Sequence, residues 1–191
     1  MKKITIPHIQ SRKGKEKITM VTAYDAPTAV LLEKGGIELI LVGDSLATVM
    51  LGYETTVPVT MEEMLHHTRA VSRSVTKPLV IGDMPFLSYQ VSLEEALRNA
   101  GRFMKEGGAG AVKLEGGKSF APLVKTLVER GIPVMGHIGL TPQYISQLGG
   151  YKVQGKSARE AENLLEDAQA LEEAGIFALV LECVPDRVAQ L

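Results

Sequence analysis

A repeated pattern of glycine followed by an apolar stretch limits the folds that this chain can adopt. Four times, glycine precedes a short apolar stretch that closes near a polar or charged residue, in GGIELILVGD, GGAGAVKLEG, RGIPVMGHIG and AGIFALVLEC. Stretches that are apolar on both faces are typical of parallel strands covered by helices. A helix that ends in glycine and leads into such a strand forms part of a βα repeat. The pattern therefore predicts an α/β protein with a parallel sheet or barrel.

Strands and helices are expected to alternate along the chain. The strands are expected at residues 18–24, 39–45, 79–86, 111–115, 134–138 and 178–184. The helices are expected at residues 26–34, 60–75, 92–106, 119–130 and 157–174. Three helices begin with Ser or Thr and carry Glu three residues later, which predicts capping boxes at Thr60, Ser92 and Ser157.

The number of expected strands is smaller than a closed barrel needs. A (β/α)8 barrel has eight strands and about 250 residues, whereas this chain has 191 residues and six expected strands. The alternatives are a complete open sheet and the first six βα units of a barrel, and we expect the barrel. The chain is then one barrel domain, residues 1–191, without the last two βα units and with an N-terminal extension at 1–16.

The composition argues against several other classes of protein. With 21 Lys and Arg against 22 Asp and Glu, nothing supports a nucleic-acid or membrane partner. No apolar run approaches the ~20 residues of a membrane span, and the N-terminus has no secretory signal. We therefore expect a cytoplasmic protein. The single cysteine, Cys183, excludes an intrachain disulfide, and we expect it to face the helices as a core residue.

Side chains capable of chemistry lie at or near the carboxyl ends of the expected strands. They are Asp25, Asp44, Ser45, Asp83, Lys113, Glu115, His137 and Glu182. Barrel active sites lie at the carboxyl ends of the strands, so these side chains are expected around one barrel mouth. For any single acid, an ion pair with lysine or a helix cap is an equally good explanation. The whole set together favours a functional site.

The excess of carboxylates predicts a divalent metal. Besides Asp25, the set contains four acids and only one Lys or Arg, Lys113. The acids are Asp44, Asp83, Glu115 and Glu182. Crowded carboxylates raise one another's pKa values unless a cation lies between them. Oxygen ligands suit Mg²⁺ better than Zn²⁺, so we expect magnesium.

Six stretches of the sequence resemble the ketopantoate hydroxymethyltransferase family. They are MVTAYDAPTA, LVGDSLATVMLGYETTVPVTMEEM, VIGDMPF, AVKLEGG, VMGHIGLTPQ and LVLECVP. The resemblance implies a (β/α)8 barrel of the phosphoenolpyruvate mutase and isocitrate lyase type, and a homo-oligomer, commonly a decamer. It implies that a hydroxymethyl group is transferred from the co-substrate 5,10-methylenetetrahydrofolate to 3-methyl-2-oxobutanoate. The product is 2-dehydropantoate, in pantothenate biosynthesis, formed through a magnesium-stabilised enolate.

The resemblance also implies roles for the residues in the matching stretches. The metal ligands would be Asp44, Asp83 and Glu115. The substrate would be held by Asp44, Ser45, Asp83, Lys113 and His137. The catalytic base would be Glu182, and we expect its apolar neighbours to raise its pKa by desolvation.

Two other functions are consistent with these residues. One is another magnesium-dependent 2-oxo-acid C–C bond lyase of the same barrel superfamily, which would need no folate. The other is a non-catalytic truncated barrel that binds a ligand or contributes only to assembly. Separately, residues 46–58 form a connection that is long for a βα unit, and we expect it to cover the site as a lid.

Overall fold

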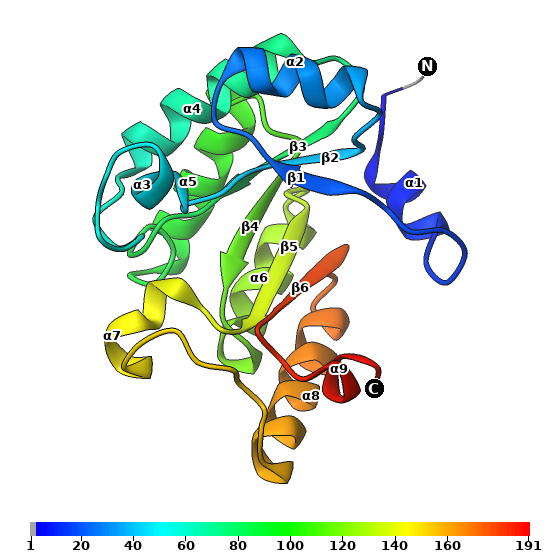
Figure 1. Cartoon of the computed structure of the whole chain (residues 1–191), viewed down its shortest axis with the longest axis vertical. Coiled ribbons are helices and arrows are strands. Elements are labelled where there is room, and N and C mark those ends of the chain that lie inside the picture. The colour runs from blue at the N-terminus through cyan, green and yellow to red at the C-terminus, as the bar shows by residue number, and fades with distance from the viewer. Residues whose placement is uncertain (1–2) are drawn as a thin grey trace. The chain divides into compact units, whose positions relative to one another are not determined.

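The computed structural model describes residues 3–191 as two compact units of alternating strands and helices (Figure 1). The first unit ends at Val112, and the second comprises Lys113–Leu191. Strand β4 (Ala111–Glu115) contains the division, so its first two residues belong to the first unit and its last three to the second. Among the described residues, no helix is long and apolar enough to span a membrane.

Three parallel strands form the sheet of the first unit. They are β1 (Met20–Thr22), β2 (Leu39–Val42) and β3 (Leu79–Asp83). Leu39 of β2 pairs with Met20 on one side and with Leu79 on the other. The helices of this unit are α1 (Ile6–Ser11), α2 (Ala26–Lys34), α3 (Leu46–Val49), α4 (Met61–Ser74) and α5 (Leu93–Lys105). Strands β2 and β3 are buried along their whole length, as the apolar runs predicted.

Parallel strands also organise the second unit. Strand β5 (Val134–Gly139) pairs with β6 (Ala178–Glu182), so that Gly139 lies opposite Glu182. The helical segments are η1 (Lys118–Phe120), α6 (Ala121–Glu129), η2 (Pro142–Tyr144), α7 (Ile145–Leu148), α8 (Ala158–Glu173) and α9 (Asp186–Ala189). Helices α6 and α8 pack beside β5. Strand β5 is buried, whereas β6 is partly exposed.

Two of the three predicted capping boxes are complete. The hydroxyls of Thr60 and Ser157 accept hydrogen bonds from the N–H groups of Glu63 and Glu160, three residues later. The carboxylates of these glutamates in turn accept from the N–H groups of Thr60 and Ser157. At Ser92 the capping box is incomplete. The Ser92 hydroxyl accepts from the Glu95 N–H, but the Glu95 carboxylate does not accept from the Ser92 N–H. Asp25 caps helix α2 through a 2.8 Å bond from the Thr28 N–H, which is the helix-cap explanation considered for single acids.

The predicted strands are all present, but several end earlier than expected. Strand β6 stops at Glu182 because Cys183 adopts a left-handed backbone conformation with φ 49°. The Cys183 side chain is exposed, so its predicted place in the core is wrong. The sequence analysis also missed the short helices α1, α3 and α7. Helices of four to six residues have too few turns to show an apolar periodicity.

Glycine at position 82 lets helix α5 approach strand β3. A Cβ atom placed on Gly82 would lie 2.3 Å from Cδ1 of Phe103, closer than any real contact. Phe103 is fully buried and packs over the strand at this point. This close packing fixes the backbone that immediately precedes Asp83, one of the predicted site residues.

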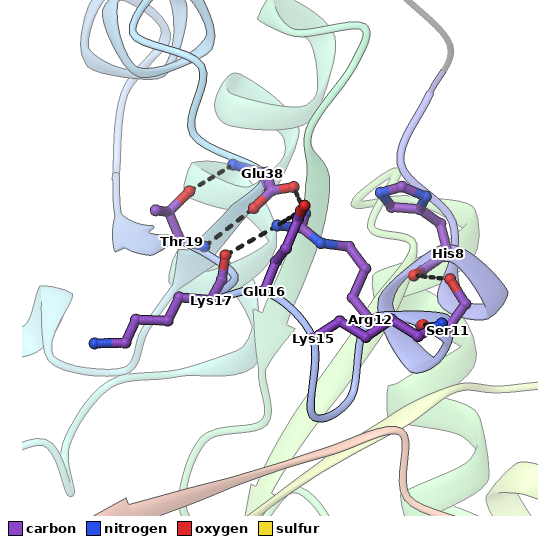
Figure 2. Close-up of polar contacts among 8 residues, drawn as sticks. All are labelled: His8, Ser11, Arg12, Lys15, Glu16, Lys17, Thr19 and Glu38. Atoms are coloured by element: carbon purple, nitrogen blue, oxygen red, sulfur yellow. Dashed lines mark hydrogen bonds and ion pairs between the residues drawn. The ribbon is translucent and has the colours of Figure 1, made fainter.

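A polar network holds residues 4–19 in place within the first unit (Figure 2). The Ile4 N–H donates to the Lys77 carbonyl at 2.8 Å. The Arg12 guanidinium pairs with the carboxylate of Glu38 and also donates to the Lys17 carbonyl at 2.9 Å. The other oxygen of Glu38 accepts the Thr19 N–H at 3.2 Å. The bonds of Glu38 join the segment before β1 to the residue that precedes β2, and the Ile4 bond joins it to the segment before β3.

The connection predicted to form a lid begins with helix α3. From the last residue of this helix onward, four of the five residues Val49–Tyr53 expose large apolar side chains, those of Val49, Met50, Leu51 and Tyr53. Nothing in the fold tests whether this segment covers a site, so the lid stays a prediction.

Candidate active site

The turn after strand β2 brings two of the predicted site residues together in the first unit. The Asp44 N–H donates to Asp83 Oδ2 at 3.1 Å. Only 4% of Asp44 and 1% of Asp83 is exposed to solvent. Asp83 ends strand β3 and Asp44 follows the neighbouring parallel strand β2, so both acids lie at the carboxyl edge of the sheet.

Gly43 leaves room for the polar groups of this turn. A Cβ atom on Gly43 would lie 2.8 Å from Ser45 Oγ and 3.8 Å from Asp83 Oδ2. Any larger residue would therefore push the Ser45 hydroxyl away from its present position. Ser45 precedes helix α3, in a helical backbone conformation.

Tyr24 is a member of this cluster that the sequence analysis missed. Its phenol oxygen lies 2.8 Å from Ser45 Oγ, and the two hydroxyls share a hydrogen bond. His67 of helix α4 donates from Nδ1 to the Tyr24 carbonyl at 2.7 Å, which holds the Tyr24 backbone. Its place in the sequence could have indicated this role, because Tyr24 is the last residue of the first expected strand and strand ends carry the other site residues.

In the second unit, three predicted residues surround the imidazole of a fourth, His137. His137 Nδ1 lies 3.3 Å from Lys113 Nζ and 3.4 Å from Glu115 Oε1, and His137 Nε2 lies 3.3 Å from Glu182 Oε2. Lys113, Glu115 and His137 are buried, whereas Glu182 is partly exposed. Glu115 also accepts the Gln143 N–H at 3.1 Å. The carboxyl ends of β4, β5 and β6 thus supply one connected polar cluster.

The contacts of His137 set the protonation of the cluster. Burial and the charge of Lys113 act to lower the pKa of His137, but its hydrogen bonds to Glu115 and Glu182 outweigh them and raise it. The same hydrogen bond from His137 lowers the pKa of Glu182, and partial burial opposes this only in part. The predicted rise in the Glu182 pKa is therefore wrong. Desolvation was expected to dominate, but the interaction with His137 outweighs it and lowers the pKa of Glu182.

The donor groups suit magnesium in their chemistry. Asp44 and Asp83 are buried carboxylates, and hard oxygen ligands of this kind are those that Mg²⁺ prefers. Across residues 3–191, no group of three or more His, Cys, Asp or Glu side chains is arranged to hold a metal ion as it stands. The assignment of Asp44, Asp83 and Glu115 as ligands therefore stays a prediction.

Comparison with known proteins identifies the family. The sequence model of the family described as ketopantoate hydroxymethyltransferase matches residues 3–191. This chain belongs to the ketopantoate hydroxymethyltransferase family. A relative from Moorella thermoacetica, named 3-methyl-2-oxobutanoate hydroxymethyltransferase, is 58% identical over 189 residues, or 98% of this chain and 70% of the relative. The predicted family and the predicted enzyme class, a hydroxymethyltransferase, are confirmed.

Solved structures confirm the fold expected of the ketopantoate hydroxymethyltransferase family. A 2,3-dimethylmalate lyase, described as a PEP mutase/isocitrate lyase superfamily member, matches with a TM-score of 0.69 at 16% identity, over 98% of this chain and 68% of that one. A phosphonopyruvate hydrolase in complex with oxalate and Mg²⁺ matches with a TM-score of 0.71 at 16% identity, over 98% of this chain and 67% of that one. The parallel βα arrangement is therefore that of the predicted barrel type.

Proposed function

We propose that this chain transfers a hydroxymethyl group from 5,10-methylenetetrahydrofolate to 3-methyl-2-oxobutanoate, forming 2-dehydropantoate in pantothenate biosynthesis. The observation that carries the proposal is the match to the ketopantoate hydroxymethyltransferase family over residues 3–191. The polar clusters at the strand ends support it, because they hold the acids, the cation and the hydroxyl that the chemistry needs. In the balanced reaction one water supplies the hydroxyl oxygen, and tetrahydrofolate is released.

Asp44 and Asp83 hold the magnesium ion in this proposal, and Glu115 is the third predicted ligand. The burial of both aspartates supports the assignment, as does the magnesium and oxalate complex of the related phosphonopyruvate hydrolase fold. When bound, Mg²⁺ polarises the ketone oxygen of the 2-oxo acid and stabilises the negative charge that develops there.

Lys113, His137 and Ser45 bind the substrate. The Lys113 ammonium is a buried cation suited to the substrate carboxylate, and burial strengthens this attraction. The Ser45 hydroxyl can donate to a substrate oxygen while it accepts from Tyr24. The partners of His137 on both ring nitrogens fix the orientation of its imidazole.

Glu182 is the catalytic base. Its carboxylate removes the proton from C3 of the 2-oxo acid, and the electron pair of that C–H bond forms the enolate. The one-carbon unit loses both of its bonds to folate nitrogens, because the C3 carbon replaces one and the oxygen of the water replaces the other. The proton from C3 and one proton of the water end on the two folate nitrogens, and tetrahydrofolate leaves. The hydrogen bond from His137 keeps Glu182 ionised and so ready to accept the proton.

Proton exchange at C3 of 3-methyl-2-oxobutanoate tests this function without folate. We expect NMR in D₂O to show loss of the C3 proton signal that depends on both the protein and Mg²⁺. Folded protein that gives no exchange at any Mg²⁺ concentration would contradict the proposal. The rival lyase reaction predicts instead that 2-dehydropantoate never forms, with or without 5,10-methylenetetrahydrofolate.

The assembly and the location of the protein are also part of the proposal. We expect a homo-oligomer, a decamer as the family resemblance implies, acting in the cytoplasm. Sedimentation velocity measures the assembly directly, and a monomer at micromolar concentration would contradict this part.

A further inference from the structure

A cavity of about 520 Å³ lies in the second unit, beside the strands that carry the proposed base. Its walls come from the segment after β4, from the end of β5 and the connection that follows it, and from helix α8. Its volume falls within the roughly 300–1,000 Å³ that is usual for small-molecule sites. The predicted site residues do not line it, so the proposed function leaves its role open.

The cavity is tied to the catalytic cluster through the backbone. Gly116, in its wall, follows Glu115 and donates its N–H to the His137 carbonyl at 3.0 Å. Gly139, also in its wall, pairs with Glu182, and a Cβ atom on Gly139 would lie 2.3 Å from the Glu182 carbonyl oxygen. A ligand in the cavity therefore lies next to the residues that carry the proposed base and its imidazole partner.

The charges of the wall argue against an anionic ligand. None of the described residues that line the cavity is Lys, Arg or His, whereas Glu160 and Asp167 are both acidic. Asp167 is already engaged, because it accepts the Lys118 N–H at 2.8 Å, and Glu160 accepts the Ser157 N–H at 3.0 Å. The 2-oxo acid, which carries a carboxylate, is therefore poorly suited to this cavity.

The remaining lining suits a flat heteroaromatic ring. Phe120 and Tyr144 offer aromatic faces on which such a ring can stack. The side-chain amides of Gln147, Gln154 and Asn163 each offer both a donor and an acceptor. A neutral ring with an amino group, an amide carbonyl and ring nitrogens along its edge would use both kinds of group.

We propose that this cavity binds the reduced pterin ring of the one-carbon donor. The proposal rests on the proposed function, which requires a folate co-substrate close to the carbon from which Glu182 removes a proton. The pyrimidine half of the reduced pterin is neutral, flat and rich in donors and acceptors, as the wall requires. The anionic glutamate tail of folate is left for the surface outside the cavity.

Binding of 6-methyltetrahydropterin, which lacks the aminobenzoate and glutamate, tests the assignment directly. Isothermal titration calorimetry compares the wild-type chain with Asn163→Leu and Gln147→Leu, both exposed enough to be replaced without disturbing the fold. Gln169→Leu is the matched control, on the same helix as Asn163 but outside the cavity. We expect at least tenfold weaker binding for both cavity variants and less than a twofold change for the control. Thermal melting checks that all three variants are folded.

The proposal is overturned if the wild-type chain does not bind the pterin, if both cavity variants bind it as the wild type does, or if the control weakens binding equally. Proton exchange at C3 of the oxo acid by the wild type needs no folate, so it tests the proposed function separately. If the cavity variants weaken pterin binding but the wild type shows no C3 exchange, the pterin site is supported and the proposed reaction is rejected.

Discussion

The hydroxyl oxygens of Tyr24 and Ser45 lie 2.8 Å apart, although 21 positions separate the two residues in the chain. The imidazole of His67 donates a hydrogen bond to the backbone carbonyl of the same tyrosine. Tyr24 therefore fixes the direction of the Ser45 hydroxyl, which the proposed function uses to bind the 2-oxo acid. We regard Tyr24 as a positioning residue.

Replacing Tyr24 by Phe tests this role. Loss of one hydrogen bond leaves Ser45 Oγ free to rotate, so we expect the KM for 3-methyl-2-oxobutanoate to rise about three- to tenfold. The kcat should change less, because the base is elsewhere. Steady-state kinetics measure both constants, with Tyr151→Phe as a control at an exposed tyrosine. An unchanged KM for Tyr24→Phe would reject the positioning role.

Two glycine-to-alanine substitutions distinguish an effect on substrate binding from an effect on stability. In Gly43→Ala the new Cβ would meet Ser45 Oγ at 2.8 Å, whereas in Gly101→Ala, inside helix α5, it meets nothing within 4 Å. We expect Gly43→Ala to weaken binding of the oxo acid at least tenfold. Gly101→Ala should stabilise the protein by about 0.5–1 kcal/mol, because alanine favours a helix interior over glycine.

Titration calorimetry with the oxo acid and thermal melting measure the two effects of these substitutions. Normal binding by Gly43→Ala would mean that the turn can shift without harming the site. A lower melting temperature for Gly101→Ala would contradict the expectation that a Cβ atom at position 101 meets no other atom.

Replacing Glu182 by Gln should stop proton removal while leaving the oxo-acid site formed. We expect C3 exchange to fall at least a hundredfold, because an amide cannot accept the proton, and magnesium and oxo-acid binding to stay within a fewfold of the wild type. NMR exchange and calorimetry measure the two properties on the same sample. Near-normal exchange in the variant would assign the base to another residue.

Glu33 makes the stability of the first unit depend on pH. Its carboxylate accepts the Thr76 N–H at 2.9 Å and the Lys77 N–H at 2.7 Å. The Thr76 bond lowers the pKa of Glu33, partial burial opposes it, and the Lys77 bond adds to the lowering. A carboxyl whose pKa is lower in the folded state contributes stability above its unfolded pKa, and this stability is lost as the pH falls through the folded pKa.

We therefore expect Glu33→Gln to destabilise the protein at pH 7 by about 0.5–1 kcal/mol, because solvent screens a charge-assisted hydrogen bond to a carboxylate that is only partly buried. The difference from the wild type should shrink below about pH 4, where the wild-type carboxyl also becomes neutral. Urea unfolding from pH 3 to pH 7 measures this, with Glu129→Gln as a control at an exposed glutamate. A difference that stays constant across this range would contradict the argument.

Much of the site could be predicted from the sequence because its residues follow a local rule. Asp44, Asp83, Glu115, His137 and Glu182 each stand near the end of an apolar strand or just after it, and Lys113 shares a strand face with Glu115. The strand ends are visible in the sequence. Tyr24 obeys the same rule, but a tyrosine after an apolar run looks like one more core residue. The pKa of Glu182 could not be predicted, because it depends on an imidazole from another strand.

The sequence by itself determined the alternation of strands and helices, the capping boxes at Thr60 and Ser157, and the family. These follow from side-chain spacing within one turn or one strand, and from ungapped motifs. Only the tertiary structure decided that His137 lowers the pKa of Glu182, that Tyr24 holds Ser45, and that a cavity without cationic side chains adjoins the base. The physical reason is that hydrogen bonding and burial depend on distances between atoms far apart in the chain, which spacing along the sequence does not contain.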